Sequence, residues 1–214
     1  MLSLNSLRQE LPTDCEILAV SKLQSVEKIR KLYTTGQRLF AENYVQEAVE
    51  KQKQLADLKI EWHFIGHLQK NKAKLVVGNF TYIHSVDSLE LAQTLDHAAR
   101  MKNLTQKIFV QINLAREESK GGIHQEDLSH FLEKSAFLGN IQVVGLMTMP
   151  PLFDDPQRAR PFFRELRELL KIHQAKCPQL QKLSMGTSSD YRIAAEEGST
   201  IVRLGTILFG ERLK

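Results

Sequence analysis

The sequence QKLSMGTSSDYRIAAEEGSTIVRL, residues 181–204, joins two short apolar segments through a loop rich in hydroxyl groups and a helix-forming segment. Its two ends, 181–185 and 200–204, are typical of buried strands. The segment 190–197 is predicted to be a short helix that Gly198 closes. A strand, a helix and a second strand in this order form a right-handed unit with parallel strands. This stretch therefore predicts a parallel sheet.

The same order recurs about eight times along the chain. Further strands are predicted at 17–21, 38–41, 61–66, 80–86, 107–114 and 141–147, and further helices at 26–33, 43–58, 88–101, 125–138 and 161–175. Such alternation predicts an α/β fold. The 214 residues lie near the lower limit of roughly 200 for a (β/α)8 barrel, and a doubly wound open sheet is the competing fold. No wide topological break interrupts the strands, so we expect a single (β/α)8 TIM-like barrel domain spanning 1–214.

Composition and charge narrow the class of protein. Hydrophobic residues make up 42% and charged residues 25% of the chain, as in soluble globular proteins. The net charge of +4 comes from interspersed residues and favours small anions over nucleic acid, which requires a basic stripe. Two isolated cysteines, Cys15 and Cys177, fit a reducing compartment. Residues 1–11 lack the features of a signal peptide, and no segment approaches the ~20 apolar residues of a membrane span. We expect a cytoplasmic protein without membrane contact.

Lys22 directly follows the first predicted strand. In a barrel, the active face lies at the C-terminal ends of the strands, so this lysine would point into the mouth. Partial loss of solvent there would lower the pKa of its ammonium, as an imine-forming lysine requires. The alternative is a surface lysine at the start of a loop, which position alone favours because most lysines stay exposed.

Two loops near the C-terminus are suited to binding an anion. Residues 184–190, SMGTSSD, follow the seventh predicted strand and combine a glycine with hydroxyl groups. Residues 203–206, RLGT, follow the eighth, where Gly205 permits a close backbone approach and Thr206 offers a hydroxyl. Phosphate sites recur after strands 7 and 8 of such barrels. The alternative for the first loop is a serine-rich helix cap. Together the two loops predict a phosphate site, provided that the barrel closes.

Other polar residues at strand ends are less informative. Asn43 either bonds a polar ring substituent or caps a helix. His84 is more simply a hydrogen-bonded structural histidine than a catalytic one. His63 and His67 lie four residues apart, but they fall in a strand pattern, so we expect no metal site. The chain also lacks a Walker A loop and a GxGxxG motif.

Taken together, these residues resemble the pyridoxal phosphate homeostasis protein family (the YggS/PROSC group), which is itself similar to the N-terminal barrel of alanine racemase. The matching stretches cover almost all of the chain in the family's order. They are LAVSK (18–22), AENYVQE (41–47), WHFIGHLQKNK (62–72), HSVDS (84–88), GLMTM (145–149), SMGTSSD (184–190) and GSTIVRLGTILFG (198–210).

The resemblance implies a barrel that binds pyridoxal 5′-phosphate (PLP), with Lys22 as the Schiff-base lysine. It places Arg203 opposite the pyridine nitrogen and Asn43 and Met149 near the ring. The phosphate-binding positions are Ser188, Gly205 and Thr206, with Ser184 and Gly186 lining the same loop. Two departures from the family pattern, Ala41 for an expected glycine and Thr187 for an expected methionine, affect only the fine geometry of the site.

The implied site suggests a carrier more than an enzyme. Arg203 has no acceptor lone pair, so the ring nitrogen would stay unprotonated and the ring would stabilise a carbanion poorly. Racemisation needs acid and base groups on both faces of the substrate carbon, and the chain ends at Lys214 without the second domain that supplies one in alanine racemase. We therefore expect a monomeric protein that holds PLP and delivers it to apo-enzymes.

Two alternatives stay open at this point. The first is a small PLP-dependent amino-acid racemase, whose second acid or base would come from Tyr44, His84 or a dimer partner. The second is a barrel that binds a sugar phosphate without forming an imine.

Overall fold

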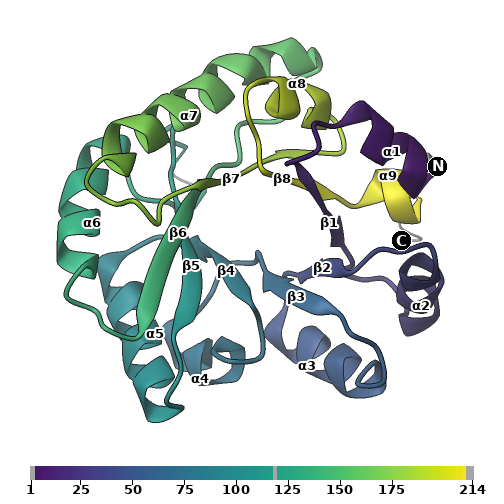
Figure 1. Cartoon of the computed structure of the whole chain (residues 1–214), viewed down its shortest axis with the longest axis horizontal. Helices are drawn as coiled ribbons and strands as arrows, with labels where there is room; N and C mark the ends of the chain where they lie inside the picture. Colours follow the sequence, from purple (N-terminus) through teal and green to yellow (C-terminus); the bar gives the residue numbers. More distant parts are fainter. Residues whose placement is uncertain (1–2, 118–119, 211–214) are drawn as a thin grey trace.

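Parallel strands pair in sequence order and close into a barrel, because the last strand hydrogen-bonds back to the first (Figure 1). This computed structural model describes residues 3–117 and 120–210. The strands are β1 Glu16–Val20, β2 Leu39–Glu42, β3 Glu61–Phe64, β4 Tyr82–Val86, β5 Gln106–Gln111, β6 Ile141–Met147, β7 Lys182–Thr187 and β8 Ile201–Leu204. The predicted (β/α)8 barrel is confirmed, and the open sheet is excluded by the β1–β8 pairing.

Helices surround the barrel as an outer ring (Figure 1). They are α1 Leu4–Glu10, α2 Val26–Thr34, α3 Val45–Gln54, α4 Ala73–Val76, α5 Leu89–Met101, α6 Leu128–Ser135, α7 Arg160–Gln174, α8 Tyr191–Glu196 and α9 Thr206–Phe209. Single 3-10 turns, Lys70–Lys72, Gln125–Asp127 and Pro156–Ala159, precede α4, α6 and α7. As predicted, Ser88 caps α5, accepting a hydrogen bond from the Leu91 N–H group.

The structure corrects several of the predicted elements. The 3-10 turn and α4 between β3 and β4 were not predicted, because each is too short to show a helical repeat. The helix predicted at 43–58 is shorter, since α3 spans only Val45–Gln54. Strand β2 extends to Glu42, one residue beyond the predicted end, and therefore carries a buried carboxylate.

The N-terminal helix α1 occupies a place in the outer ring beside α9 (Figure 1). Its Leu4 and Leu7 side chains are buried in the main core. At its C-terminal end, Glu10 accepts hydrogen bonds from Tyr191 at 2.5 Å and from Arg192 at 3.0 Å. These contacts attach α1 to α8, which follows the seventh strand.

The core has two layers. The larger lies between the strands and the helices, and the smaller is centred on seven buried side chains: Leu18, Val20, Ala41, Phe109, Val144, Met147 and Ile201. Buried polar residues lie on the remaining strands and on β8: they include His63 on β3, His84 on β4, Ser184 on β7 and Arg203 on β8. Ala41, which stands where the family pattern has a glycine, is fully buried in the smaller cluster.

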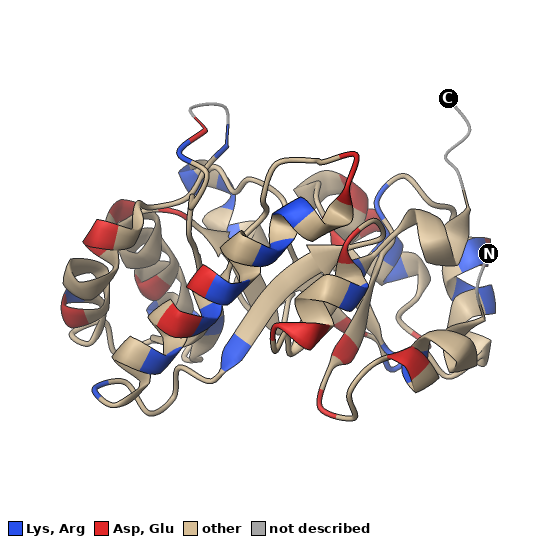
Figure 2. Cartoon of the chain, turned by 90° about the horizontal axis from the view of Figure 1, so that it is seen from above, with Lys and Arg blue, Asp and Glu red and all other residues tan. Residues whose placement is uncertain are grey.

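Charges of both signs are mixed on the same helices (Figure 2), which agrees with the small net charge. Among residues 3–117 and 120–210, no helix is long and apolar enough to cross a membrane.

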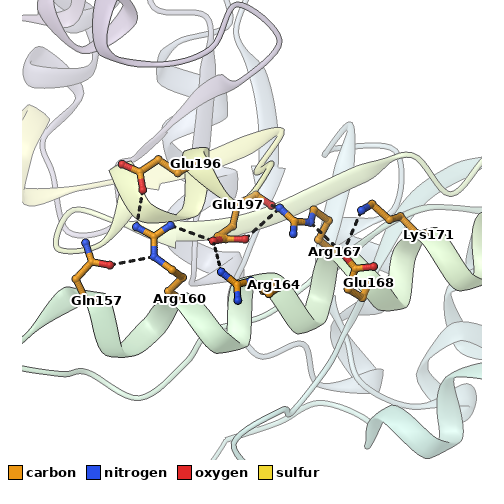
Figure 3. Close-up of polar contacts among 8 residues, drawn as sticks. All are labelled: Gln157, Arg160, Arg164, Arg167, Glu168, Lys171, Glu196 and Glu197. Atoms are coloured by element: carbon orange, nitrogen blue, oxygen red, sulfur yellow. Dashed lines mark hydrogen bonds and ion pairs between the residues drawn. The ribbon is translucent and has the colours of Figure 1, made fainter.

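An ion network fixes α8 against α7 (Figure 3). Glu197, whose side chain is 6% exposed, contacts Arg160 at 3.0 Å, Arg164 at 3.3 Å and Arg167 at 3.0 Å. Burial opposes ionisation of this carboxyl, but hydrogen bonds from Arg160 and Arg164 and the nearby charges outweigh it and lower the pKa of Glu197. The network thus anchors the helix that follows the β7 loop.

We predict that Glu197→Gln destabilises the fold by roughly 1–3 kcal/mol at neutral pH, because charge-assisted hydrogen bonds are lost. A lowered pKa in the folded state stabilises the protein above the unfolded value of about 4.3, and this contribution disappears as pH falls through the folded pKa. Urea unfolding should therefore show a wild-type advantage at pH 7 that shrinks toward pH 3.

Glu168→Gln is the matched control, since this carboxylate joins the same network but its side chain is 50% exposed. Its effect should be smaller. An equal loss in both variants, or a pH-independent loss for Glu197→Gln, would contradict this account.

Candidate functional site at the C-terminal mouth of the barrel

A cavity of about 700 Å³ opens at the C-terminal ends of the strands. Most of the side chains predicted for the site line it: Lys22, Asn43, Met149, Ser188, Arg203, Gly205 and Thr206. These residues come from the loops after β1, β2, β6 and β7, from β8 and the residue after it, and from the start of α9. Ser184 and Gly186, which were also predicted, do not line the cavity.

Lys22 lies two residues beyond β1 and is half-buried. Both neighbours in its loop are fixed by hydrogen bonds. The Ser21 N–H group donates to the Ala41 carbonyl at 2.9 Å, and the Leu23 N–H group donates to Glu47 Oε1 at 2.6 Å. Leu23 adopts a φ of +60°, which is unfavourable for a branched side chain. The loop is thus held in a strained conformation that aims Lys22 at the cavity.

A buried ion cluster beneath this loop supplies the restraint. Lys51 Nζ contacts Glu42 Oε1 at 2.8 Å, Glu47 Oε1 at 2.6 Å and the Ser21 carbonyl at 2.7 Å. The Ser21 hydroxyl also donates to Glu42 at 2.6 Å. Burial raises the pKa of the Glu42 carboxyl despite the opposing charge of Lys51. Lys51 is therefore the cation that keeps two acidic groups and the Lys22 loop together.

Asn43 follows β2 and is placed by a close backbone contact. A Cβ atom on Gly66 would lie 1.9 Å from the Asn43 carbonyl oxygen, so only glycine fits there. Within the described residues the buried Asn43 Oδ1 accepts no hydrogen bond. A bound molecule with a hydroxyl or N–H group can satisfy this acceptor.

The loops after β7 and β8 meet each other at the cavity. The Gly205 N–H group donates to the Ser188 hydroxyl at 3.2 Å. Gly186 has a φ of +91°, and a Cβ atom there would lie 2.5 Å from the Ala194 side chain. Its role is therefore to let α8 pack closely behind the loop rather than to touch a ligand. The Thr187 hydroxyl lines the cavity and donates to Asp190 at 3.0 Å.

Arg203 is buried and held on two sides. Its Nη1 donates to the Ser184 carbonyl at 2.6 Å and to the Ser184 hydroxyl at 2.8 Å, and its Nη2 donates to the Thr148 carbonyl at 2.9 Å. Burial lowers the pKa of the guanidinium to about 10, so it stays charged at neutral pH. Ser184 thus supports Arg203 from behind.

Several cavity residues were not singled out from the sequence. They include Ile65, Gly66, Asp87, Gln111, Lys120 and Gly121, from β5 and the loops after β3, β4 and β5, and His67, which was considered only as a metal ligand, lines the cavity as well. The same strand-end rule could have found Asp87, which directly follows β4. Tyr44 and His84, considered as acid or base groups, do not line the cavity: Tyr44 is exposed and His84 is fully buried.

A closed parallel barrel with a polar cavity at its C-terminal mouth places the chain in one class of (β/α)8 barrels, and a family model identifies that class. The model for "Alanine racemase, N-terminal domain" matches residues 3–213. Alanine racemase of Clostridium difficile shares this fold, with a TM-score of 0.76 at 19% identity, over 97% of this chain and 58% of that one.

Closer relatives identify the family. A pyridoxal phosphate homeostasis protein of Aquifex aeolicus is 44% identical over 92% of this chain and 87% of its own length. The corresponding protein of Synechocystis is 44% identical over 95% and 94%. The chain belongs to the pyridoxal phosphate homeostasis protein family.

Solved structures support the same conclusion. PipY of Synechococcus elongatus, at 41% identity, covers 97% of this chain and 98% of its own. Its structure without PLP superposes with a TM-score of 0.93, and its structure with PLP bound superposes with a TM-score of 0.91.

We predict that Lys51→Met destabilises the protein by about 3 kcal/mol or more, because it leaves Glu42 buried without its cation. The double variant Lys51→Met with Glu42→Gln should recover part of that loss, since the uncompensated charge is removed. Thermal or urea unfolding measures both. A double variant no more stable than Lys51→Met would contradict a charge-based explanation.

Proposed function

We propose that this protein binds PLP in the barrel mouth, holds it as a Schiff base on Lys22 and buffers the cofactor for other enzymes. The observation that carries the proposal is the convergence of Lys22, Arg203 and the Ser188–Gly205 loop contact on one cavity. Membership of the homeostasis family and the PLP bound to PipY support the same ligand.

The cavity offers a partner to each polar part of PLP. The Lys22 amine would attack the aldehyde and release water, forming a reversible imine. The hydroxyls of Ser188 and Thr206 and the backbone of Gly205 suit the phosphate, as expected for loops after strands 7 and 8 of a barrel. Asn43 Oδ1, a buried acceptor within the described residues, suits the ring hydroxyl. Each group matches in chemical type.

Arg203 limits the chemistry that the bound cofactor can support. A guanidinium only donates hydrogen bonds, so the pyridine nitrogen opposite it must act as an acceptor and stay unprotonated. The ring is then a weak electron sink, which disfavours reactions through a carbanion. A holding role suits this electrostatic arrangement better than amino-acid catalysis.

Access to the site is compatible with exchange of the cofactor. Met149 and Thr206, which line the cavity, are exposed to solvent. We infer that PLP, released when water hydrolyses the imine, passes to PLP-dependent apo-enzymes in the cytoplasm, and that the protein acts as a monomer with one barrel domain.

Borohydride reduction of the PLP-loaded protein should fix the cofactor on Lys22, and peptide mass spectrometry should locate the adduct. Lys22→Ala should lose the visible imine absorbance. Lys120→Ala is the control, because Lys120 lines the same cavity and should leave the adduct in place. An adduct on another lysine, or none, would end the Schiff-base proposal. If Lys22→Ala bound a sugar phosphate as tightly as the wild type, and the wild type showed no visible chromophore, the alternative without an imine would be favoured.

Transfer is tested by mixing PLP-loaded protein with a PLP-dependent apo-enzyme and a scavenger of free PLP. We expect enzyme activity to recover faster than with the same amount of free PLP under the same conditions. Recovery no faster than from free PLP would contradict delivery. Sustained interconversion of D- and L-amino acids by the isolated protein would instead favour the racemase.

A further inference from the structure

A hydrogen-bonded row of polar side chains (the file) runs through the barrel, from Glu61 at the start of β3 to Arg203 at the cavity. It starts at Glu61 Oε1, which lies 3.1 Å from His63 Nε2. His63 Nδ1 lies 2.9 Å from His84 Nε2, and His84 Nδ1 lies 2.8 Å from the Ser184 hydroxyl. The Arg203 contact at 2.8 Å completes the file. Strands β3, β4, β7 and β8 each contribute to it.

The middle of this file is sealed from water. His63, His84 and Ser184 are each 0% exposed. Phe109 stacks on the His84 ring with the centroids 4.2 Å apart, and Tyr82 lies 4.8 Å from the His63 ring. Unsatisfied polar groups in such surroundings cost several kcal/mol each, so this polar set persists only because its members bond one another.

The two ends of the file differ in kind. Arg203 can only donate a hydrogen bond. Glu61 can only accept one when ionised, and the hydrogen bond from His63 lowers the pKa of its carboxyl. Burial lowers the pKa of both His63 and His84, so each ring is neutral and carries one N–H proton.

These constraints leave one arrangement of protons. Four contacts join the five groups, and four protons are available, one each from Arg203, Ser184, His84 and His63. The ionised Glu61 carboxylate must accept from His63 Nε2, so His63 Nδ1 is unprotonated and accepts from His84 Nε2. His84 Nδ1 is then unprotonated, so the Ser184 hydroxyl donates to it while its oxygen accepts from Arg203. Both histidines are therefore fixed as the Nε2–H tautomer.

We propose that Ser184, His84 and His63 are positioning residues that hold the Arg203 guanidinium at the cavity through this ordered chain, whose direction Glu61 sets from the opposite end of the barrel. The consequence for PLP rests on the function proposed above. The Ser184 and Thr148 contacts fix the plane of the guanidinium, and the chain fixes Ser184 as an acceptor toward it. A misoriented Arg203 would meet the pyridine nitrogen poorly.

The tautomers can be measured without any cofactor. Nitrogen-15 NMR of histidine-labelled protein at pH 7 should show His63 and His84 protonated at Nε2 and unprotonated at Nδ1. His84→Phe and His63→Phe assign the two signals. An Nδ1–H tautomer at either ring, or a doubly protonated ring, would overturn the ordered chain.

The functional effect is tested by His84→Phe, which keeps an aromatic ring against Phe109 but removes both hydrogen bonds. We expect about tenfold weaker PLP binding and a shifted pH dependence of the bound chromophore, with the adduct still on Lys22. Tyr82→Phe is the control, because Tyr82 lies on β4 with His84 and packs its ring, which the substitution keeps, against both histidines. PLP binding and spectrum unchanged in His84→Phe would refute the positioning role.

The variant Glu61→Leu tests whether Glu61 sets the donor-to-acceptor direction of the hydrogen-bonded chain. Removing the terminal acceptor should change the His63 tautomer signals and shift the chromophore, whereas Glu61→Gln, which keeps an acceptor oxygen, should preserve the tautomers. Identical signals in wild type and Glu61→Leu would exclude this role for Glu61. If the wild-type protein did not bind PLP, the proposed function would be wrong. The tautomers measured by NMR would still show whether the ordered chain of hydrogen bonds exists.

Discussion

The pairing of β1 with β8 is the contact on which the rest of the molecule depends. Glu16, Ile17, Leu18 and Ala19 pair in register with residues 201–204. This pairing joins the two ends of the sheet, so the Lys22 loop, which follows the first strand, lies beside the Gly205 loop, which follows the last. Parallel strands place all their following loops at one end, and closure turns that row of loops into a ring around a cavity.

The closed barrel also buries charged side chains, Glu42 and Arg203, that need polar partners. Glu42 ends β2 inside the protein and is matched by Lys51 from α3, while Arg203 on β8 is supported by carbonyl and hydroxyl groups rather than by a carboxylate. The first arrangement fixes the loop that carries Lys22. The second leaves a positive group at the cavity, which suits an anionic ligand with a ring acceptor. The Glu42–Lys51 pair adds little net free energy of folding, since burying two charges costs about as much as their attraction returns.

The barrel is shared with proteins whose sequences differ widely. Alanine racemase of Clostridium difficile has the same fold at 19% identity, which says nothing about shared chemistry. The site of this chain is built from its loops and its polar interior. Ser184 connects Arg203 to two histidines behind it, and these side chains come from three other strands.

The sequence by itself determined the order of strands and helices, and with it the end of the barrel at which Lys22, Asn43, Ser188 and Thr206 would gather. That much follows from local periodicity and from the rule that parallel strands share one loop face. The sequence did not show that Ser184 would lie behind Arg203, that Gly186 would face α8, or that His63 and His84 would meet. Alternation along a strand says which side chains point inward, but not which of them face one another across a closed barrel. Only the tilt and register of the strands bring residues 63, 84, 184 and 203 to successive levels, and these depend on the whole ring of pairings at once.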